Sequence, residues 1–136
     1  MLIRENLWLK PLKFMEILHK ELSYKIVGLA MQVHRELGYG FLEKVYENSL
    51  MILMRESGIK AEQQVPIKVH FRGQIVGDYM ADILVEDSII LELKVIDKIT
   101  KFQIAQTINY SKATNLKLAL LINFGKSSLE HERIVL

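Results

Sequence analysis

The chain has 136 residues, which suffices for one domain and excludes two. Half of the residues are hydrophobic, a quarter are charged, and Gly and Pro number only seven and two, which excludes disordered and low-complexity classes. The formal net charge of +2 by itself points to no partner. Cysteine is absent, which excludes disulfide scaffolds, Cys-ligated zinc, iron–sulfur clusters and thiol nucleophiles.

The beginning of the chain predicts neither a membrane span nor a cleavable signal. No apolar run approaches the roughly 20 residues that cross a bilayer, and Arg4, Glu5, Lys10 and Lys13 interrupt any apolar signal core. We therefore expect a cytoplasmic protein without a membrane partner. Residues 1–14 show no clear period, so we predict a peripheral arm there and a single domain over 15–136.

Helical spacing of apolar residues predicts a long amphipathic helix from about Glu16 to Leu37, which Gly38-Tyr39-Gly40 ends. A second helix is predicted from Phe41 to about Glu56. The residues expected to face inward from this second helix are Leu42, Val45, Tyr46, Leu50, Leu53 and Met54.

The period then changes from 3.6 to 2, which predicts strands. The first covers residues 64–71, with Pro66 placing it near a sheet edge. Arg72-Gly73 forms a turn to a second strand over 74–85, and residues 86–88 turn into a third over 89–95, whose apolar character indicates a central position.

A helix over about 100–113, capped by Thr100, a buried strand over 118–122 and a short last strand over 133–136 complete the prediction. The predicted order is ααβββαβ(β), an α/β fold.

Three charged residues in this sheet point to chemistry. Glu92 and Lys94 share one face of the third strand. If Val85 pairs with Ile89 across the turn, Asp82 lies opposite Glu92. At ~5 Å and an effective dielectric of 20, the two carboxylates repel each other by about 3 kcal/mol.

Three arrangements would relieve this repulsion: protonation of one carboxylate, neutralisation by Lys94, or a hard divalent cation between the oxygens. With Mg²⁺ or Mn²⁺ at Asp82 and Glu92, Lys94 would orient a bound water or stabilise charge on phosphorus. The bland alternative for Glu-x-Lys in a strand is a solvated ion pair.

At this point the residues match a family pattern. Asp82, nine intervening residues and Glu92-Leu93-Lys94 resemble the core of the PD-(D/E)XK nuclease superfamily, with Ala81 in place of the Pro. Gly40-Phe41-Leu42-Glu43-Lys44-Val45-Tyr46 resembles the motif of the GxxExxY proteins within it. Gln106 to Tyr110 is similar to the Q-x-x-x-Y found in several branches.

The resemblance implies a restriction-endonuclease-like αβββαβ core, a mixed sheet flanked by helices, here with an extra N-terminal helix. It implies Asp82, Glu92 and the Leu93 carbonyl as metal ligands, Lys94 as the catalytic lysine, and Glu43 as an accessory ligand in the catalytic site. Gln106 and Tyr110 share a helix face and would position Lys94 or a phosphate, completing the expected catalytic residues.

Each of these helix residues also has a structural interpretation. Glu43 near a helix start is favoured by the helix dipole alone. Tyr46 fits the core, with its hydroxyl available to fix Glu43. Gln106 and Tyr110 form an ordinary polar and aromatic pair at helix spacing.

We therefore expect a nuclease that hydrolyses DNA, in preference to RNA, with Mg²⁺ or Mn²⁺. The alternative is a catalytically silent module on the same fold that binds nucleic acid or protein; a purely structural protein is a third interpretation. One site cuts one strand, so a homodimer would suit duplex cleavage.

Overall fold

The structure, a computed structural model, describes the backbone of residues 2–136 and the side chains of residue 16 and residues 19–136. Eight elements follow one another: α1 (Leu2–Leu37), α2 (Glu43–Glu56), β1 (Ala61–Phe71), β2 (Gln74–Val85), β3 (Ile89–Lys94), α3 (Lys101–Thr114), β4 (Leu118–Asn123) and β5 (Glu130–Val135). The predicted α/β class and element order are confirmed.

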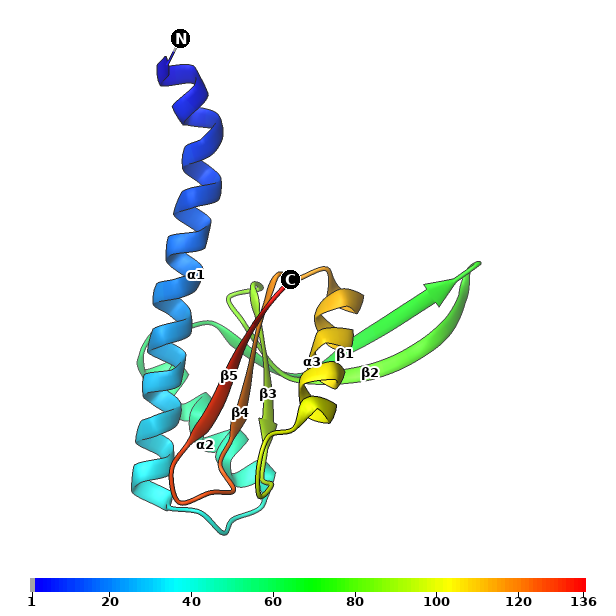
Figure 1. Cartoon of the computed structure of the whole chain (residues 1–136). Helices are drawn as coiled ribbons and strands as arrows, with labels where there is room; N and C mark the ends of the chain where they lie inside the picture. Colours follow the sequence, from blue (N-terminus) through cyan, green and yellow to red (C-terminus); the bar gives the residue numbers. More distant parts are fainter. Residues whose placement is uncertain (1) are drawn as a thin grey trace.

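The first helix is longer than predicted. It begins at Leu2 rather than near Glu16 and runs through the expected boundary at residue 15. In Figure 1 its N-terminal half extends beyond the sheet. The division into an arm over 1–14 and a domain over 15–136 stays a prediction. Among the described residues, no helix has both the length and the apolar character needed to cross a membrane.

The sheet is mixed, with the spatial order β1-β2-β3-β4-β5. Only β3 and β4 are parallel, joined by the crossover through α3; the other neighbours are antiparallel. The central position of β3 and the edge position of β1 are as predicted. Thr100 caps α3 through a capping box with Gln103, which explains why the helix begins directly after it.

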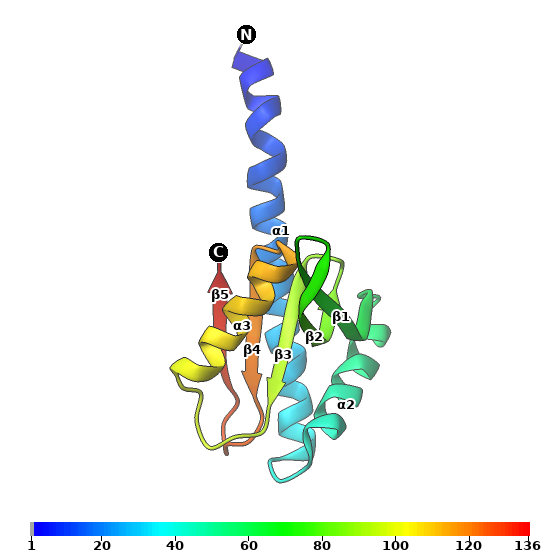
Figure 2. The same ribbon diagram turned by 90° about the vertical axis from the view of Figure 1, so that its right-hand side faces the viewer.

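Helices cover both faces of the sheet (Figures 1 and 2). On one face α1 and α2 pack against alternate residues of β2, β3 and β4, with Ile26, Leu50 and Leu91 fully buried. On the other face α3 covers Ile90 and Leu121. This two-sided burial explains why β3 and β4 are apolar nearly throughout.

The start of α2 differs from the prediction. The helix begins at Glu43 instead of Phe41, and Leu42, at its N-cap, is 80% exposed. Val45 is also exposed, so the expectation that these two side chains face inward was wrong. Tyr46, Leu50 and Met54 are fully buried, as predicted.

Candidate active site

The site begins where β2 separates from β3. Their ladder pairs Val85 with Ile89 and Ile83 with Leu91, as the turn predicted, and ends there. Asp82 and Glu92, the next two residues of the same register, do not form a ladder pair. Asp82 also lacks a ladder partner on the β1 side. The β1–β2 ladder pairs Gln63 with Ile83 and Val65 with Ala81, but it does not pair Gln64 with Asp82.

The β1–β2 pair exchanges its two faces at this point. In β2, Ile83 belongs to the core under α1 and α2, whereas Ala81 belongs to the core under α3, although both have odd numbers. The alternation of a regular strand would put both on one face. Opposite Asp82, Gln64 has a positive φ of 53°, which supplies the local twist. The irregularity therefore turns the Asp82 side chain toward β3.

Side-chain hydrogen bonds replace the missing ladder pair. The carboxylate of Asp82 accepts the Leu93 N–H with an N···O distance of 2.7 Å. The carboxylate of Glu92 accepts the Asp82 N–H at a longer 3.4 Å. The sequence correctly predicted that the two carboxylates are neighbours, but they are brought together by these bonds and not by direct cross-strand pairing.

The backbone carbonyl of Leu93 points to the same edge of β3. In a strand, the N–H and C=O of one residue point to one side and those of the next residue to the other. The Leu93 N–H is directed at Asp82, and the Lys94 carbonyl accepts the Phe124 N–H from the β4 side. The Leu93 oxygen therefore joins the two carboxylates on the β2 side of the strand.

The two carboxylates are electrostatically strained. Burial, followed by the negative charge of Asp82, raises the pKa of Glu92 to about 8. Burial also raises the pKa of Asp82, although the Leu93 N–H works in the opposite direction. Glu92 is only 4% exposed, so little water is available to stabilise its charge. The folded protein therefore disfavours the state in which both carboxylates are ionised without a counterion.

Glu43 and Lys94 complete the charged group. Burial and the charge of Asp82 raise the pKa of Glu43, which lies at the first position of α2, while Lys94 lowers it. The positive charge of Lys94 also acts on Asp82 and Glu92. Among the described residues, Lys94 forms no ion pair with the three carboxylates. The structure thus brings all four residues into one electrostatic group.

The two α3 residues are placed differently. Tyr110 packs against Tyr79 of β2 with ring centroids 5.3 Å apart. Burial raises its pKa first, followed by the charges of Glu92 and Asp82, so its hydroxyl lies within their field. Gln106 is half-buried one turn earlier on the helix. Within the described part of the chain its side chain has no hydrogen bond to Lys94 or the carboxylates.

Sequence reasoning missed Glu47, a carboxylate buried to 2% exposure beneath this group. It accepts hydrogen bonds from Lys44 Nζ at 2.8 Å, Gln63 Nε2 at 2.6 Å and Gln64 Nε2 at 3.0 Å. These bonds fix α2 to the part of β1 that lies opposite Asp82. The sequence did contain an indication, because Glu47 shares the helix face of Leu50 and helix spacing therefore places its carboxylate on the buried side of α2.

Tyr46 lies in the core as predicted, but its hydroxyl has partners other than Glu43. Its hydroxyl donates to the Gly38 carbonyl at 2.6 Å and accepts the Phe41 N–H at 3.2 Å, so it does not hold Glu43. Its ring stacks on Phe124 with centroids 4.6 Å apart. Tyr46 thereby anchors the loop that leads into α2, which determines where Glu43 lies.

Asn123 fixes the backbone beyond Lys94. Its side chain accepts the Ile96 and Gly125 N–H groups and donates to the Ile96 carbonyl and the Glu130 carboxylate, at 2.9 to 3.1 Å. Asn123 is fully buried, so these four bonds are screened from water. They connect the ends of the parallel strands and hold Lys94 at a defined position.

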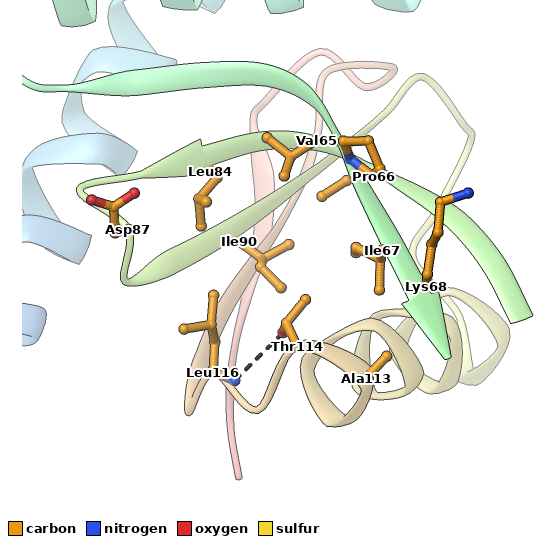
Figure 3. A pocket seen from close by; sticks show the side chains of 11 residues that line it. Val65, Pro66, Ile67, Lys68, Leu84, Asp87, Ile90, Ala113, Thr114 and Leu116 are labelled. Atoms are coloured by element: carbon orange, nitrogen blue, oxygen red, sulfur yellow. Dashed lines mark hydrogen bonds between the residues drawn. The ribbon is translucent and has the colours of Figure 1, made fainter. Parts of the chain in front are cut away.

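A separate cavity of about 330 Å³ lies between the sheet and the C-terminal end of α3 (Figure 3). Most of the lining is apolar, including Val65, Leu84, Ile90 and Leu116, with Lys68 and Asp87 as its charged members. It contains none of the site carboxylates. It shows that the region where the β1–β2 pair leaves the sheet is incompletely covered by α3.

As it stands, the described part of the chain has no three His, Asp or Glu side chains close enough to hold a metal ion by themselves. The oxygen donors that do converge are two carboxylates, from Asp82 and Glu92, and one backbone carbonyl, from Leu93. Hard cations such as Mg²⁺ bind through one or two carboxylates and several waters. The donor set therefore fits Mg²⁺ or Mn²⁺ without a third side chain.

Comparisons with known proteins identify a matching family and a similar fold. The family model described as PD-(D/E)XK nuclease superfamily matches residues 20–134. No curated protein matches the chain. The crystal structure of SSO0001 has a TM-score of 0.55 and 15% sequence identity, covering 68% of this chain and 50% of that one. The chain thus spans half the length of that protein, and the likeness concerns the fold alone.

Proposed function

Because the chain belongs to the PD-(D/E)XK nuclease superfamily, we propose that it is a metal-dependent nuclease that hydrolyses phosphodiester bonds of DNA. One observation carries the proposal: the β2–β3 ladder opens at the motif residues, and Asp82 takes the Leu93 N–H in place of a backbone partner. Two adjacent carboxylates, one buried and one half-buried, would destabilise a regular sheet at this position.

We propose Asp82, Glu92 and the Leu93 carbonyl as ligands of Mg²⁺ or Mn²⁺, with Glu43 as an accessory ligand. The fit rests on charge as well as on oxygen chemistry. Both carboxylates have raised pKa values, chiefly because of burial, and a divalent cation would favour their ionised forms. When bound, the cation would polarise the scissile phosphate and lower the pKa of a water molecule.

The remaining steps belong to this chain's own side chains. Lys94 carries a positive charge next to the carboxylates and would orient the attacking water or stabilise charge that develops on the phosphate oxygens. Tyr110, whose hydroxyl lies in the field of Glu92, would donate a hydrogen bond to a phosphate oxygen. Gln106, on the same face of α3, would help to hold Lys94.

The GxxExxY motif supports a finer assignment within the superfamily. Its Glu43 interacts electrostatically with Asp82 and Lys94, and its Tyr46 anchors the loop before α2. We therefore infer that the chain belongs to the GxxExxY group. The preference for DNA is supported by the two-stranded β1–β2 extension, because B-form DNA has a major groove that admits such a ribbon, whereas the A-form groove is narrow.

Cleavage assays with purified protein test the proposal. Plasmid, linear, nicked, branched and single-stranded DNA are incubated with Mg²⁺ or Mn²⁺, and RNA of the same sequences is the competing substrate. Asp82→Asn, Glu92→Gln and Lys94→Ala should each reduce the rate at least about 100-fold, because each removes a group that acts on the reacting phosphate. The same variants should keep the wild-type circular dichroism spectrum.

The chain offers matched controls directly after β3. Asp97→Asn and Lys98→Ala remove an exposed carboxylate and an exposed ammonium group outside the site, and should leave the rate within about twofold. Calorimetric titration with Mn²⁺ gives an independent measurement. A wild-type protein that binds DNA but neither binds Mn²⁺ nor cleaves would be the silent binding module. Cleavage that survives in both Asp82→Asn and Lys94→Ala would disprove the mechanism.

A further inference from the structure

The distal part of the β1–β2 hairpin supplies none of the charged residues of the site described above. Residues 66–80, which we call the ribbon, pair only with each other, because the β2–β3 ladder begins at Ile83. Figure 1 shows the ribbon extending away from the rest of the sheet. At its end, Arg72 and Gly73 have φ values of 49° and 77°, typical of a tight two-residue hairpin turn.

The end of the ribbon exposes apolar side chains that the described residues of the chain leave largely uncovered. Phe71, Ile75 and Val76 have 61%, 53% and 63% of their surface exposed. A solvated hairpin that served only as a connection would carry polar residues here. Exposed apolar groups gathered at the end of an extension indicate a binding surface.

The charges of the ribbon favour a polyanion as the partner. Its single carboxylate, Asp78, is paired with Lys68 at 3.3 Å. Arg72 at the turn has no acidic neighbour in the sequence from residue 69 to residue 77. Its guanidinium carbon lies 5.3 Å from the centre of the Phe71 ring, so a cation and an exposed aromatic face are presented together.

This combination fits nucleic acid whose base faces are accessible. Arg72 can bind a phosphate, but Phe71, Ile75 and Val76 cannot bind a charged backbone and need an apolar surface. The flat faces of bases provide one, and they are accessible only where stacking is interrupted, at strand ends, nicks and branch points. A stacked duplex hides these faces.

We propose that the ribbon is a nucleic-acid-binding arm whose end stacks Phe71 on an unstacked base at a DNA end or branch, with Arg72 on the adjoining phosphate. The proposal rests on the proposed nuclease function and adds a substrate class to it. The arm and the site are joined by one strand, because β2 begins directly after the turn and contains Asp82. At ~3.3 Å per residue, Gly73 of the turn lies at most about 30 Å from Asp82, the length of roughly nine base pairs.

Competition binding measures the preference that this arrangement requires. Fluorescence anisotropy follows a labelled forked duplex in Ca²⁺, used in place of Mg²⁺ to prevent turnover. Unlabelled fork and relaxed, covalently closed circular duplex serve as competitors, because the circle offers no strand end or branch. The wild-type protein should prefer the fork at least about tenfold, the size of one base–aromatic stacking contact.

Substitutions at the end of the ribbon separate its two contacts. Phe71→Ala should weaken binding to the fork about tenfold and leave the circle unchanged, whereas Phe71→Trp should keep the preference. Arg72→Ala should weaken both by the same factor and reduce the salt dependence by about one phosphate. The controls are Tyr24→Ala and Arg133→Ala, an exposed aromatic residue on α1 and an exposed cation on the opposite edge strand.

The results distinguish the arm from the nuclease. If Phe71→Ala binds the fork as tightly as the wild type does, or if the wild type does not prefer the fork, the proposed arm is overturned. Mg²⁺-dependent cleavage by the wild type would still support the nuclease in that case. If Phe71→Ala or Arg72→Ala differs from the wild type in the molar mass measured by light scattering, the ribbon is a contact between two copies of the chain. That result also overturns the proposed arm. Phe71-dependent binding of the fork without cleavage would support the arm and reject the nuclease.

Discussion

The raised pKa of Glu92 makes a direct prediction about stability. In the metal-free protein, Glu92→Gln should be more stable than the wild type at alkaline pH and equally stable at acid pH. Glutamine has the shape of the protonated glutamic acid and can still accept the Asp82 N–H through its amide oxygen. It carries no charge, so it avoids the cost of burying a carboxylate beside Asp82.

The sign and size follow from the two pKa values of Glu92. The unfolded chain ionises near 4.5, whereas the folded protein holds the proton to about pH 8. The contribution of Glu92 to the free energy of unfolding is therefore fully present below pH 4.5 and is lost as the pH rises toward 8. Over that range the folded state binds more protons than the unfolded state, so a rising pH favours unfolding. At 1.36 kcal/mol per pH unit, the loss is on the order of 4–5 kcal/mol.

Urea denaturation from pH 4.5 to 9, in EDTA, measures this difference. The two proteins should have equal free energies of unfolding at pH 4.5 and differ by on the order of 4 kcal/mol at pH 8.5, with the variant more stable. A difference that does not change with pH would refute the reasoning. Saturating Mn²⁺ should then stabilise the wild type by ~3 kcal/mol at 100 times its Kd and have little effect on the variant.

Three further substitutions and one control, Gly28→Ala, test the parts that hold the site in place, each by its free energy of unfolding in urea. Glu47→Ala should cost about 3 kcal/mol, because three hydrogen-bond donors lose their buried acceptor; an effect below 1 kcal/mol would contradict the role of this carboxylate. Tyr46→Phe should cost about 1–2 kcal/mol, since the loop before α2 loses two hydrogen bonds; unchanged stability would show that the loop does not need them. Gly125→Ala should lower the free energy of unfolding by at least about 2 kcal/mol, because a Cβ would collide with the backbone of Ile96. Gly28→Ala, which has open space in α1, should raise the free energy of unfolding by ~0.5–1 kcal/mol. Equal effects of the two substitutions would contradict the packing at Gly125.

Local patterns were sufficient to predict most of the fold. The turn at residues 86–88 and the apolar run after it determine the register of β2 and β3, and the structure has the same register from Val85 to Ile83. Thr100 predicts the start of α3, and the capping box that the structure shows between it and Gln103 is likewise a contact within one turn. Such features depend on neighbours in the sequence.

The exact start of α2 could not be predicted in the same way. Leu42 and Val45 have the spacing of core residues, yet both are exposed. The reason lies far away in the sequence, since Tyr46 stacks on Phe124 and its hydroxyl holds the loop at Gly38 and Phe41. Helix periodicity does not contain that contact.

The candidate site shows the same limit at the level of chemistry. The motif identifies Asp82, Glu92 and Lys94, but strict alternation predicts a regular ladder with the carboxylates opposed across it. The structure instead interrupts two ladders at Asp82, with Gln64 at a positive φ on the β1 side. The amide of Gln64 binds the buried Glu47, so this irregularity depends on a helix that precedes the strand.

This interruption explains how one strand serves two purposes. If Asp82 had kept its ladder partners, the sheet would have continued beyond Ile83, and the β1–β2 pair would have remained flat against β3. Because the Asp82 carboxylate takes the Leu93 N–H, the strands separate at the acidic pair and the ribbon extends from that point. The residue proposed to bind the metal therefore also directs the proposed DNA-binding arm. A substitution such as Asp82→Ala should change the orientation of the ribbon as well as the chemistry, whereas Glu92→Gln should leave the orientation of the ribbon unchanged.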